Sequence, residues 1–103
     1  MPVIKPTVGR VVLFVPSQDT YQFGYCFLKG REHAAIVCAV HGDRMVNVSV
    51  FDVNGKQVPM TSVKLVQPGD PIPEGENYCK WMDYQVGQAQ KTEQLEKELA
   101  AKA

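Results

Sequence analysis

The 103-residue sequence has little net charge, no long hydrophobic run and no short motif typical of a catalytic or metal site. Eleven basic side chains balance eleven acidic ones. A net charge near zero disfavours a protein that coats nucleic acid or an anionic membrane through bulk electrostatics. No apolar run approaches the roughly 20 residues of a membrane-spanning helix, and the first residues lack the apolar centre of a signal peptide. We therefore expect a cytoplasmic protein.

Cysteine is also sparse, and its spacing excludes two kinds of site. The three residues Cys26, Cys38 and Cys79 form no C-x-x-C pair, so neither a structural zinc site nor a dithiol redox centre is indicated. We expect no metal and no cofactor. Cys38 lies within an apolar run, where a free thiol behaves as a small hydrophobic side chain. The interpretation is three buried or half-buried thiols in a reducing compartment.

Only two histidines are present, and their spacing gives no catalytic pair. His33 follows Glu32, and His41 lies two residues before Asp43. Neighbouring residues in a strand point to opposite faces, so His33 and Glu32 do not form a dyad by spacing alone. No glycine-rich phosphate loop, G-x-S-x-G or H-E-x-x-H sequence occurs. We expect a protein that is not an enzyme.

What the sequence does contain is a series of short β patterns followed by a polar helical segment. Strands are predicted over about residues 10–15, 34–41, 45–52 and 57–66, with a short last strand in Tyr78–Met82. Asn54-Gly55 is a strong hairpin signal. We expect an all-β core, a small SH3-like antiparallel barrel or sheet of about four to six strands, with a C-terminal helix. The predicted division is a barrel domain over 1–83 and a helical tail over 84–103.

The hydrophobic phase changes within the fourth predicted strand. Val58 and Met60 share one parity, whereas Val63 and Leu65 share the other. A bulge at Thr61-Ser62 would return both pairs to the core face. The predicted core comprises Val12, Phe14, Ile36, Cys38, Val46, Val48, Val50, Val58, Val63 and Leu65.

The long connection over residues 16–33 is the strongest candidate for a binding element. Its aromatic residues alternate at a strand period, which predicts an extra hairpin arm; they are Tyr21, Phe23, Tyr25 and Phe27. Aromatic rings stack on bases, and basic side chains bind phosphates. The alternative interpretation is that the arm only covers one end of the barrel as a small additional core.

A ligand site is predicted around this arm. Tyr25 is expected to stack on a base, while Arg31 and Arg44 are expected to bind phosphate through their planar guanidinium groups. The full predicted ligand-binding set is Tyr25, Arg31, His33, Arg44, Asn47, Lys80 and Trp81. Trp81 has two interpretations: it anchors the tail to the barrel, or it lines a pocket between subunits with Lys80 and Lys91.

The C-terminal segment is polar on nearly all sides, with only Thr92, Leu95 and Leu99 forming a seam at helical spacing. A solvated, partly frayed helix and a dimer seam both fit this pattern. We expect a homo-oligomer, most simply a dimer or a dimer-based assembly. An open edge of the predicted sheet would offer a second route to self-association.

One group of known proteins shares the order of these motifs. The segments are Gly9-Arg10-Val11-Val12, His33 to Val37, Val46 to Asp52 with Asn54-Gly55, and a Trp-bearing segment over 78–82. In this order the chain resembles small uncharacterised proteins of tailed bacteriophages over about residues 8–95. Small β-rich phage proteins with helical C-terminal parts include anti-defence sponges such as anti-Thoeris proteins, which oligomerise and sequester host nucleotide signals. The similarity to sponges is at the level of fold and implies a role in immune evasion.

Three functions are therefore weighed. The first is a non-enzymatic phage protein in the host cytoplasm that binds a small anionic nucleotide, a cyclic nucleotide or an ADP-ribose-type molecule, between its subunits. The alternative is a virion or adaptor protein that acts through protein–protein contacts. A nucleic-acid binder that uses a barrel surface is the third, and zero net charge disfavours it.

Overall fold

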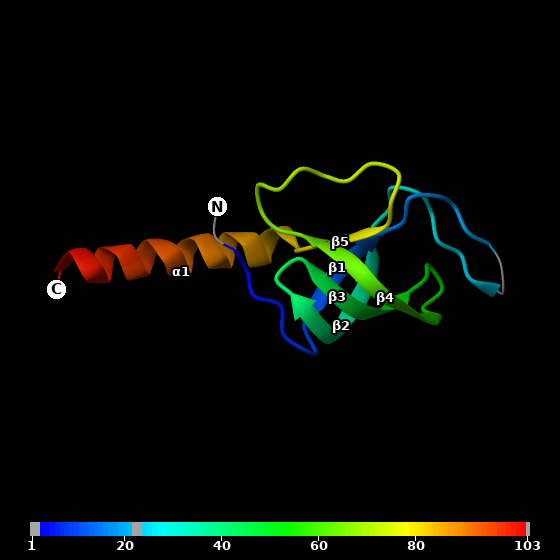
Figure 1. Cartoon of the computed structure of the whole chain (residues 1–103), viewed down its shortest axis with the longest axis horizontal. Helices are drawn as coiled ribbons and strands as arrows, with labels where there is room; N and C mark the ends of the chain where they lie inside the picture. Colours follow the sequence, from blue (N-terminus) through cyan, green and yellow to red (C-terminus); the bar gives the residue numbers. More distant parts are fainter. Residues whose placement is uncertain (1–2, 22–23, 103) are drawn as a thin grey trace.

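A computed structural model describes residues 3–21 and 24–102, and within them five strands precede one helix. The elements are β1 (Val11–Val15), β2 (His33–Gly42), β3 (Met45–Phe51), β4 (Gln57–Val66), β5 (Tyr78–Lys80) and α1 (Asp83–Lys102). The strands form a closed barrel in the order β1-β2-β3-β4-β5, and α1 projects from it (Figure 1). The predicted all-β core with a C-terminal helix is confirmed.

Closure of the barrel depends on the short strand β5. It pairs antiparallel with β1 and parallel with β4, whereas the other neighbouring strands pair antiparallel. The parallel pairing departs from the expected antiparallel pattern. It is possible because the connection over 67–77 is long enough to bring the chain back beside Lys64, where β5 begins to pair with β4. Because the barrel is closed, β4 has a strand on both sides over Lys64–Val66, which removes that part of the open edge expected as a route to self-association. Self-association itself stays a prediction.

The two faces of β2 are the reverse of the prediction. Ile36 is 38% exposed and Cys38 is also exposed, whereas Ala35 and Val37 are buried. The register explains this, because Val12 lies directly opposite Ala35 and residues opposite each other share a face. The buried Val12 therefore requires Ala35 inside. Placing Ile36 and Cys38 in the core was wrong, since every residue in 34–40 is apolar and the run carries no alternation.

The remaining predicted core residues are buried. They are Val12, Phe14, Val46, Val48, Val50, Val58, Val63 and Leu65. The predicted bulge in β4 is also confirmed. The register shifts between the Val46–Val63 and Val48–Met60 pairs, and Ser62 has a φ of 52°. This extra residue returns Val63 to the barrel interior and bends the strand, as a small closed barrel requires.

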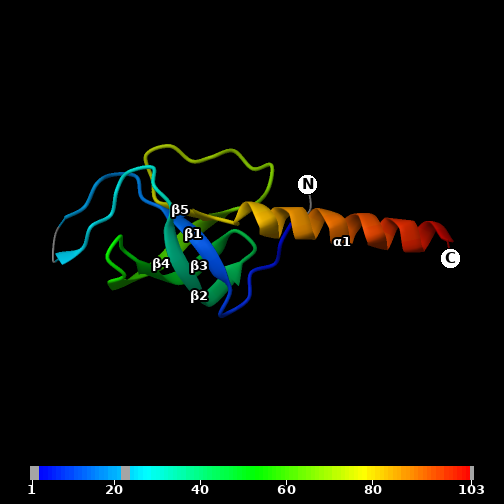
Figure 2. The ribbon, with the colours of Figure 1, turned by 180° about the vertical axis from the view of Figure 1, so that it is seen from behind.

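The connection between β1 and β2 forms the predicted arm. Thr20 and Phe27 lie opposite each other and exchange both backbone hydrogen bonds, each with an N···O distance of 2.9 Å. Of the four alternating aromatic residues, Phe23 lies outside the described residues. Figure 1 and Figure 2 show the arm at the end of the barrel that lies away from the free end of α1.

Away from the arm, the side chain of Gln67 hydrogen-bonds the backbone of the N-terminal segment in the way a neighbouring strand would. The Gln67 side chain is 1% exposed, and it both accepts from the Ile4 N–H and donates to the Ile4 carbonyl, each at 2.9 Å. Its amide nitrogen also donates to the carbonyl oxygen of Asp43 at 2.6 Å. These bonds fix the N-terminal segment against the barrel, close to the first turns of α1.

A second glutamine sets the start and direction of α1. The backbone N–H of Met82 donates to Gln85 Oε1 at 2.8 Å, which is one half of a capping box. Gln85 Nε2 donates to the carbonyl oxygen of Val11 in β1 at 3.0 Å. Trp81 is 3% exposed and belongs to the core, as its interpretation as an anchor for the tail requires. The alternative, a pocket between subunits, stays a prediction.

Beyond its first turns α1 leaves the barrel. Gln85 is its one buried residue, and the described part of the chain extends over 58 × 25 × 22 Å. Leu95 and Leu99 are 58% and 67% exposed. Within residues 3–21 and 24–102, no helix has both the length and the apolar character that crossing a membrane demands.

Candidate functional site

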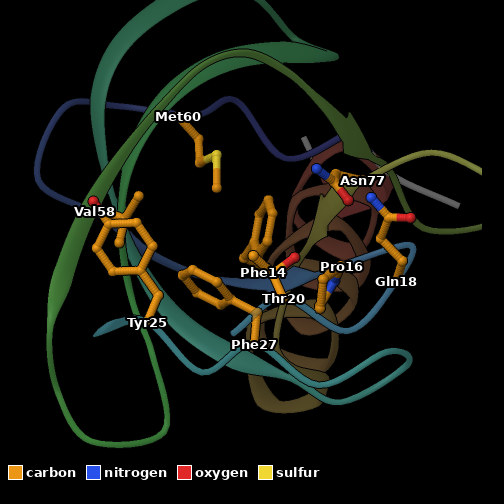
Figure 3. Close-up of a pocket in the computed structure, with 9 residues that line it drawn as sticks. All are labelled: Phe14, Pro16, Gln18, Thr20, Tyr25, Phe27, Val58, Met60 and Asn77. Atoms are coloured by element: carbon orange, nitrogen blue, oxygen red, sulfur yellow. The ribbon is translucent and has the colours of Figure 1, made fainter. Parts of the chain in front are cut away.

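A pocket lies where the arm meets the end of the barrel (Figure 3). Its volume is about 230 Å³. The arm, the end of β1, β4 and the residue before β5 all contribute to it. The lining residues are Phe14, Pro16, Gln18, Thr20, Tyr25, Phe27, Val58, Met60 and Asn77. We call it the barrel-end pocket.

Aromatic rings form the floor and one wall of the barrel-end pocket. Phe14 and Phe27 are almost fully buried and pack edge to face, with ring centroids 6.0 Å apart. The Tyr25 ring lies 6.2 Å from Phe27 and remains half-buried. Figure 3 shows Tyr25 beside Val58, with Met60 further along β4. A rigid apolar surface of this kind favours a hydrophobic group of a ligand.

The arm is fixed to the barrel by the buried carboxylate of Asp52. Its Oδ2 accepts a hydrogen bond from the Cys26 N–H at 2.8 Å, and its Oδ1 accepts from the N–H groups of Asn54 and Lys56 at 2.9 and 2.8 Å. Burial alone would raise the pKa of Asp52, but these backbone hydrogen bonds outweigh it and hold the pKa below its ordinary value. The β3–β4 turn and the arm therefore share one charged acceptor.

The other side of the arm is held by two side-chain acceptors. Asn77 Oδ1 accepts from the Ser17 N–H at 2.8 Å, and Asp19 Oδ1 accepts from the Lys29 N–H at 2.7 Å. The first of these bonds joins the arm to the segment before β5. Because both sides of the arm are tied, the barrel-end pocket is formed in the free chain and needs no ligand to assemble it.

The polar groups of the barrel-end pocket are uncharged, and its two amide side chains lie at one side. Figure 3 shows the amide side chains of Gln18 and Asn77 near each other, away from Tyr25. None of the described lining residues is charged. Beside the pocket, Lys56 places its Nζ 5.0 Å from the centroid of the Tyr25 ring. The pocket thus offers an apolar cavity flanked by hydrogen-bonding amides, which matches an apolar side chain flanked by peptide groups.

Of the predicted ligand-binding residues, Tyr25 lines this pocket. His33 lies beneath it in the core, 4% exposed, with its ring edge to face against Phe27 at a centroid distance of 5.1 Å. Its Nε2 accepts a hydrogen bond from the Leu28 N–H at 3.3 Å. His33 therefore supports the arm from below and presents no free imidazole to a ligand.

Arg44 and Asn47 lie on other parts of the barrel. Arg44 Nε donates to Asp70 Oδ2 at 2.8 Å, and this hydrogen bond raises the pKa of Arg44 and lowers that of Asp70. Asn47 Oδ1 accepts from the Ser62 N–H at the bulge at 2.8 Å and lies 3.0 Å from His41 Nε2. Both side chains hold turns of the barrel in place.

The last three predicted residues are also separate from the barrel-end pocket. Lys80 Nζ lies 2.6 Å from Glu32 Oε2, and the hydrogen bond between them raises the pKa of Lys80. Trp81 is buried with the Arg10 guanidinium 5.0 Å from its ring centroid. Arg31 is exposed in the turn before β2. A single chain does not bring the seven residues into one site, and a site shared between chains stays a prediction.

The cysteines divide into three environments. Cys79 is buried in the core, and burial raises the pKa of its thiol to about 12. Cys26 is half-buried, whereas Cys38 is exposed on the outer face of β2, contrary to the expected burial. In the described part of the chain, no group of three or more His, Cys, Asp or Glu side chains has an arrangement that would hold a metal ion.

Sequence reasoning found part of the pocket and missed the rest. The alternating aromatic pattern pointed to Tyr25 and Phe27, and both line it. Gln18 and Asn77 carried no signal, because they lie in loop segments whose approach depends on closure of the barrel. The Phe27 ring also covers the barrel end as part of the core, as the alternative interpretation expects of the arm. Whether the arm has a binding role as well stays a prediction.

Comparisons of this chain with protein-family profiles, with curated protein sequences and with solved structures gave no match. The resemblance to tailed-phage proteins therefore stays a prediction. The geometry of the barrel-end pocket carries the functional proposal.

Proposed function

We propose that the chain is a non-enzymatic binding module that holds a protein partner at the barrel-end pocket, as an adaptor or virion component would. The single observation that carries this proposal is the character of the pocket lining. It combines buried aromatic rings with uncharged amide side chains, and none of its described residues is charged. Such a lining accepts an apolar side chain and hydrogen-bonds the peptide groups on either side of it.

The size of the pocket supports a peptide over a whole metabolite. Its volume is about 230 Å³, whereas sites for small molecules usually measure about 300–1,000 Å³. A cavity below that range takes one or two side chains of an extended segment. Tyr25 and Met60 are only half-buried, so their exposed parts remain for contact with such a segment.

Nucleotide binding is the second candidate, and one observation favours it. The Tyr25 ring at the pocket has the Lys56 ammonium group 5.0 Å from its centroid, so an aromatic face and a cation lie together. A sponge-type site between subunits would have to add its phosphate ligands from Arg31 or from a second chain. Arg44 is already bound to Asp70. The protein partner is therefore the first choice.

The expected setting follows from the phage resemblance and the free thiols. Three unpaired cysteines suit a reducing cytoplasm. We accordingly expect the partner to be a phage structural protein or a protein of the infected host cell.

Selection of peptides on the immobilised chain tests this function. A random-peptide display library should yield segments with a shared apolar, uncharged centre. The selected peptides should lose about tenfold in affinity when Tyr25→Ala removes the pocket wall, which corresponds to about 1.4 kcal/mol. The matched control is Tyr84→Ala, since Tyr84 is a 66% exposed tyrosine on α1 outside this pocket.

The competing nucleotide hypothesis is tested on the same preparation. Cyclic di- and trinucleotides and ADP-ribose isomers are screened by thermal shift, because a ligand at 100 times its dissociation constant raises stability by about 2.7 kcal/mol. A shift with one of these molecules, together with failure to select any peptide, would replace the adaptor proposal by the sponge proposal.

A further inference from the structure

The barrel closes along only part of β4. The short strand β5 pairs with β4 over Lys64–Val66, whereas β3 pairs with β4 from Gln57 onward. Within the described part of the chain, Gln57–Val63 therefore has a strand on its β3 side and none on its other side. We call this stretch the β4 open edge. It lies at the barrel-end pocket, because Val58 and Met60 both line that pocket.

Backbone hydrogen bonds show how the β4 open edge is oriented. The Asp52 N–H donates to the Lys56 carbonyl oxygen at 2.9 Å, so these two residues form a hydrogen-bonded pair between β3 and β4. In an antiparallel ladder, pairs that exchange hydrogen bonds alternate with pairs that do not. Val58 and Met60, two and four residues further along the chain, therefore direct their backbone groups toward β3.

The residues between them direct their backbone groups away from β3. On that outward side the β4 open edge presents the N–H groups of Gln57 and Thr61 and the carbonyl oxygens of Gln57 and Pro59. None of the other described residues hydrogen-bonds these groups. Pro59 suits the position, since proline has no N–H and is tolerated on the side of a strand that faces no neighbour. The β4 open edge is thus a row of unpaired backbone groups beside an apolar pocket.

We propose that an extended segment of the protein partner adds to the β4 open edge as a further strand and sets alternate apolar side chains into the barrel-end pocket. The inference rests on the proposed function and names the conformation and the residue pattern of its ligand. Residues that lie opposite each other on neighbouring strands share a face. Side chains of the added strand opposite Val58 and Met60 therefore point into the pocket, where Phe14 and Phe27 form its aromatic surface.

The far wall of the pocket supplies polar groups for the second side of the added strand. Figure 3 shows Gln18 and Asn77 across the pocket from Val58. Asn77 accepts the Ser17 N–H through its Oδ1, so its NH2 group remains to donate to a peptide carbonyl. Because Asn77 directly precedes β5, the added strand extends the line of β5 along β4.

A segment of different sequence fits the β4 open edge better than the same edge of a second copy. In the symmetric antiparallel register that overlaps the whole outward row, Pro59 lies opposite Pro59 of the partner subunit. Neither proline has an N–H, so two carbonyl groups face each other without a donor. The stretch Gln57–Val63 contains no charged residue, and we expect the added segment to be uncharged at its centre as well.

Amide hydrogen exchange followed by NMR tests the open edge in the full chain. Without peptide, the amides of Gln57 and Thr61 should exchange at least about tenfold faster than those of Val58 and Met60. A bound seven-residue peptide from the display selection should slow exchange at Gln57 and Thr61. Slow exchange at both amides without peptide, or protection that rises with protein concentration as it does in a dimer, would overturn the proposal.

Backbone methylation of the same peptide tests strand pairing directly. Methyl groups on alternate peptide nitrogens remove the donors to Gln57 and Pro59 and should weaken binding about tenfold, whereas those on the intervening nitrogens should change affinity by less than about threefold. Pro59→Ala adds an N–H to the β4 open edge and should strengthen binding about threefold. The matched control is Pro71→Ala in the exposed 67–77 connection, which should leave the affinity unchanged.

The outcomes separate this inference from the proposed function. Peptides that bind but show equal effects at successive methylated positions, with no gain in Pro59→Ala, overturn strand addition and leave the adaptor proposal standing. Failure to select any peptide overturns both.

Discussion

The Oδ2 atom of Asp52 lies 2.8 Å from the backbone nitrogen of Cys26, and this hydrogen bond joins the β3–β4 turn to the arm. The other oxygen of the same carboxylate serves the turn itself through Asn54 and Lys56. One oxygen of Asp52 therefore holds the arm, and the other holds the turn. This separation allows the position of the arm to be changed while the turn is retained.

Asp52→Asn should release the arm and keep the turn. An asparagine oxygen can still accept from Asn54 and Lys56, but its amide group then presents donors toward the Cys26 N–H. The expected result is faster hydrogen exchange at the Cys26 amide and weaker binding of a pocket-directed peptide. Asp70→Asn is the matched control, because Asp70 binds Arg44 at a different part of the barrel. Equal loss of peptide binding in both variants would contradict the prediction.

Acid should loosen the arm and the 67–77 connection before it unfolds the core. Hydrogen bonds hold the pKa values of Asp52 and Asp70 below the ordinary 3.8 in the folded chain. A lowered folded pKa contributes stability that is present above the unfolded pKa and is lost as the pH falls through the folded pKa. Amide exchange at Cys26 and Gln67 should therefore accelerate below about pH 4. The Cys26 part of this change should be absent in Asp52→Asn.

The reversed faces of β2 give a direct test by truncation. Val37→Ala should lower the free energy of unfolding by about 1–3 kcal/mol, because Val37 is almost fully buried. Val48→Ala should behave in the same way. Ile36→Ala removes a larger side chain but from the outer face, so its effect should stay within about 0.5 kcal/mol. Urea unfolding measures all three, and a larger loss for Ile36→Ala than for Val37→Ala would refute the register.

Gln85 should link helix formation to the barrel. Gln85→Ala removes the acceptor for the Met82 N–H and the donor to the Val11 carbonyl, which should lower stability by about 1–2 kcal/mol. Gln85→Glu retains the acceptor at Met82 but loses the donor to Val11. It should preserve the helical circular dichroism signal better than Gln85→Ala. Gln88→Ala, at an exposed position one turn later, serves as the control.

The three thiols should react in an order set by burial. Exposed Cys38 should react first with a disulfide reagent at pH 8, and half-buried Cys26 should follow. Burial raises the pKa of Cys79 to about 12, so its thiol stays protonated and inaccessible until the barrel unfolds. Thiol counting with and without denaturant checks this order. In Cys38→Ser only Cys26 and Cys79 remain. If either reacted as fast as Cys38 does in the unaltered chain, the predicted order would be contradicted.

Local patterns along the chain predicted most elements of the fold. The strand over residues 57–66, the phase slip at Thr61-Ser62 and the start of α1 near residue 84 all follow from short-range rules of alternation, turn chemistry and helix propensity. These rules need only neighbouring residues. The alternating aromatics of the arm likewise pointed to Tyr25 and Phe27, which both line the barrel-end pocket, because a period of two places such residues on one face.

Long-range register decided what the patterns left open. In the run Ala34–Val40 every side chain is apolar, so its inward face was set only when β1 placed Val12 opposite Ala35. Closure of the barrel brought Asn77 to Ser17, and it left Arg44 beside Asp70 instead of near Tyr25. The sequence by itself determined the β strands, the bulge, the arm and the polar helix. Tertiary structure decided which faces were buried, which charges were paired and where the pocket formed, because each depends on contacts between residues distant along the chain.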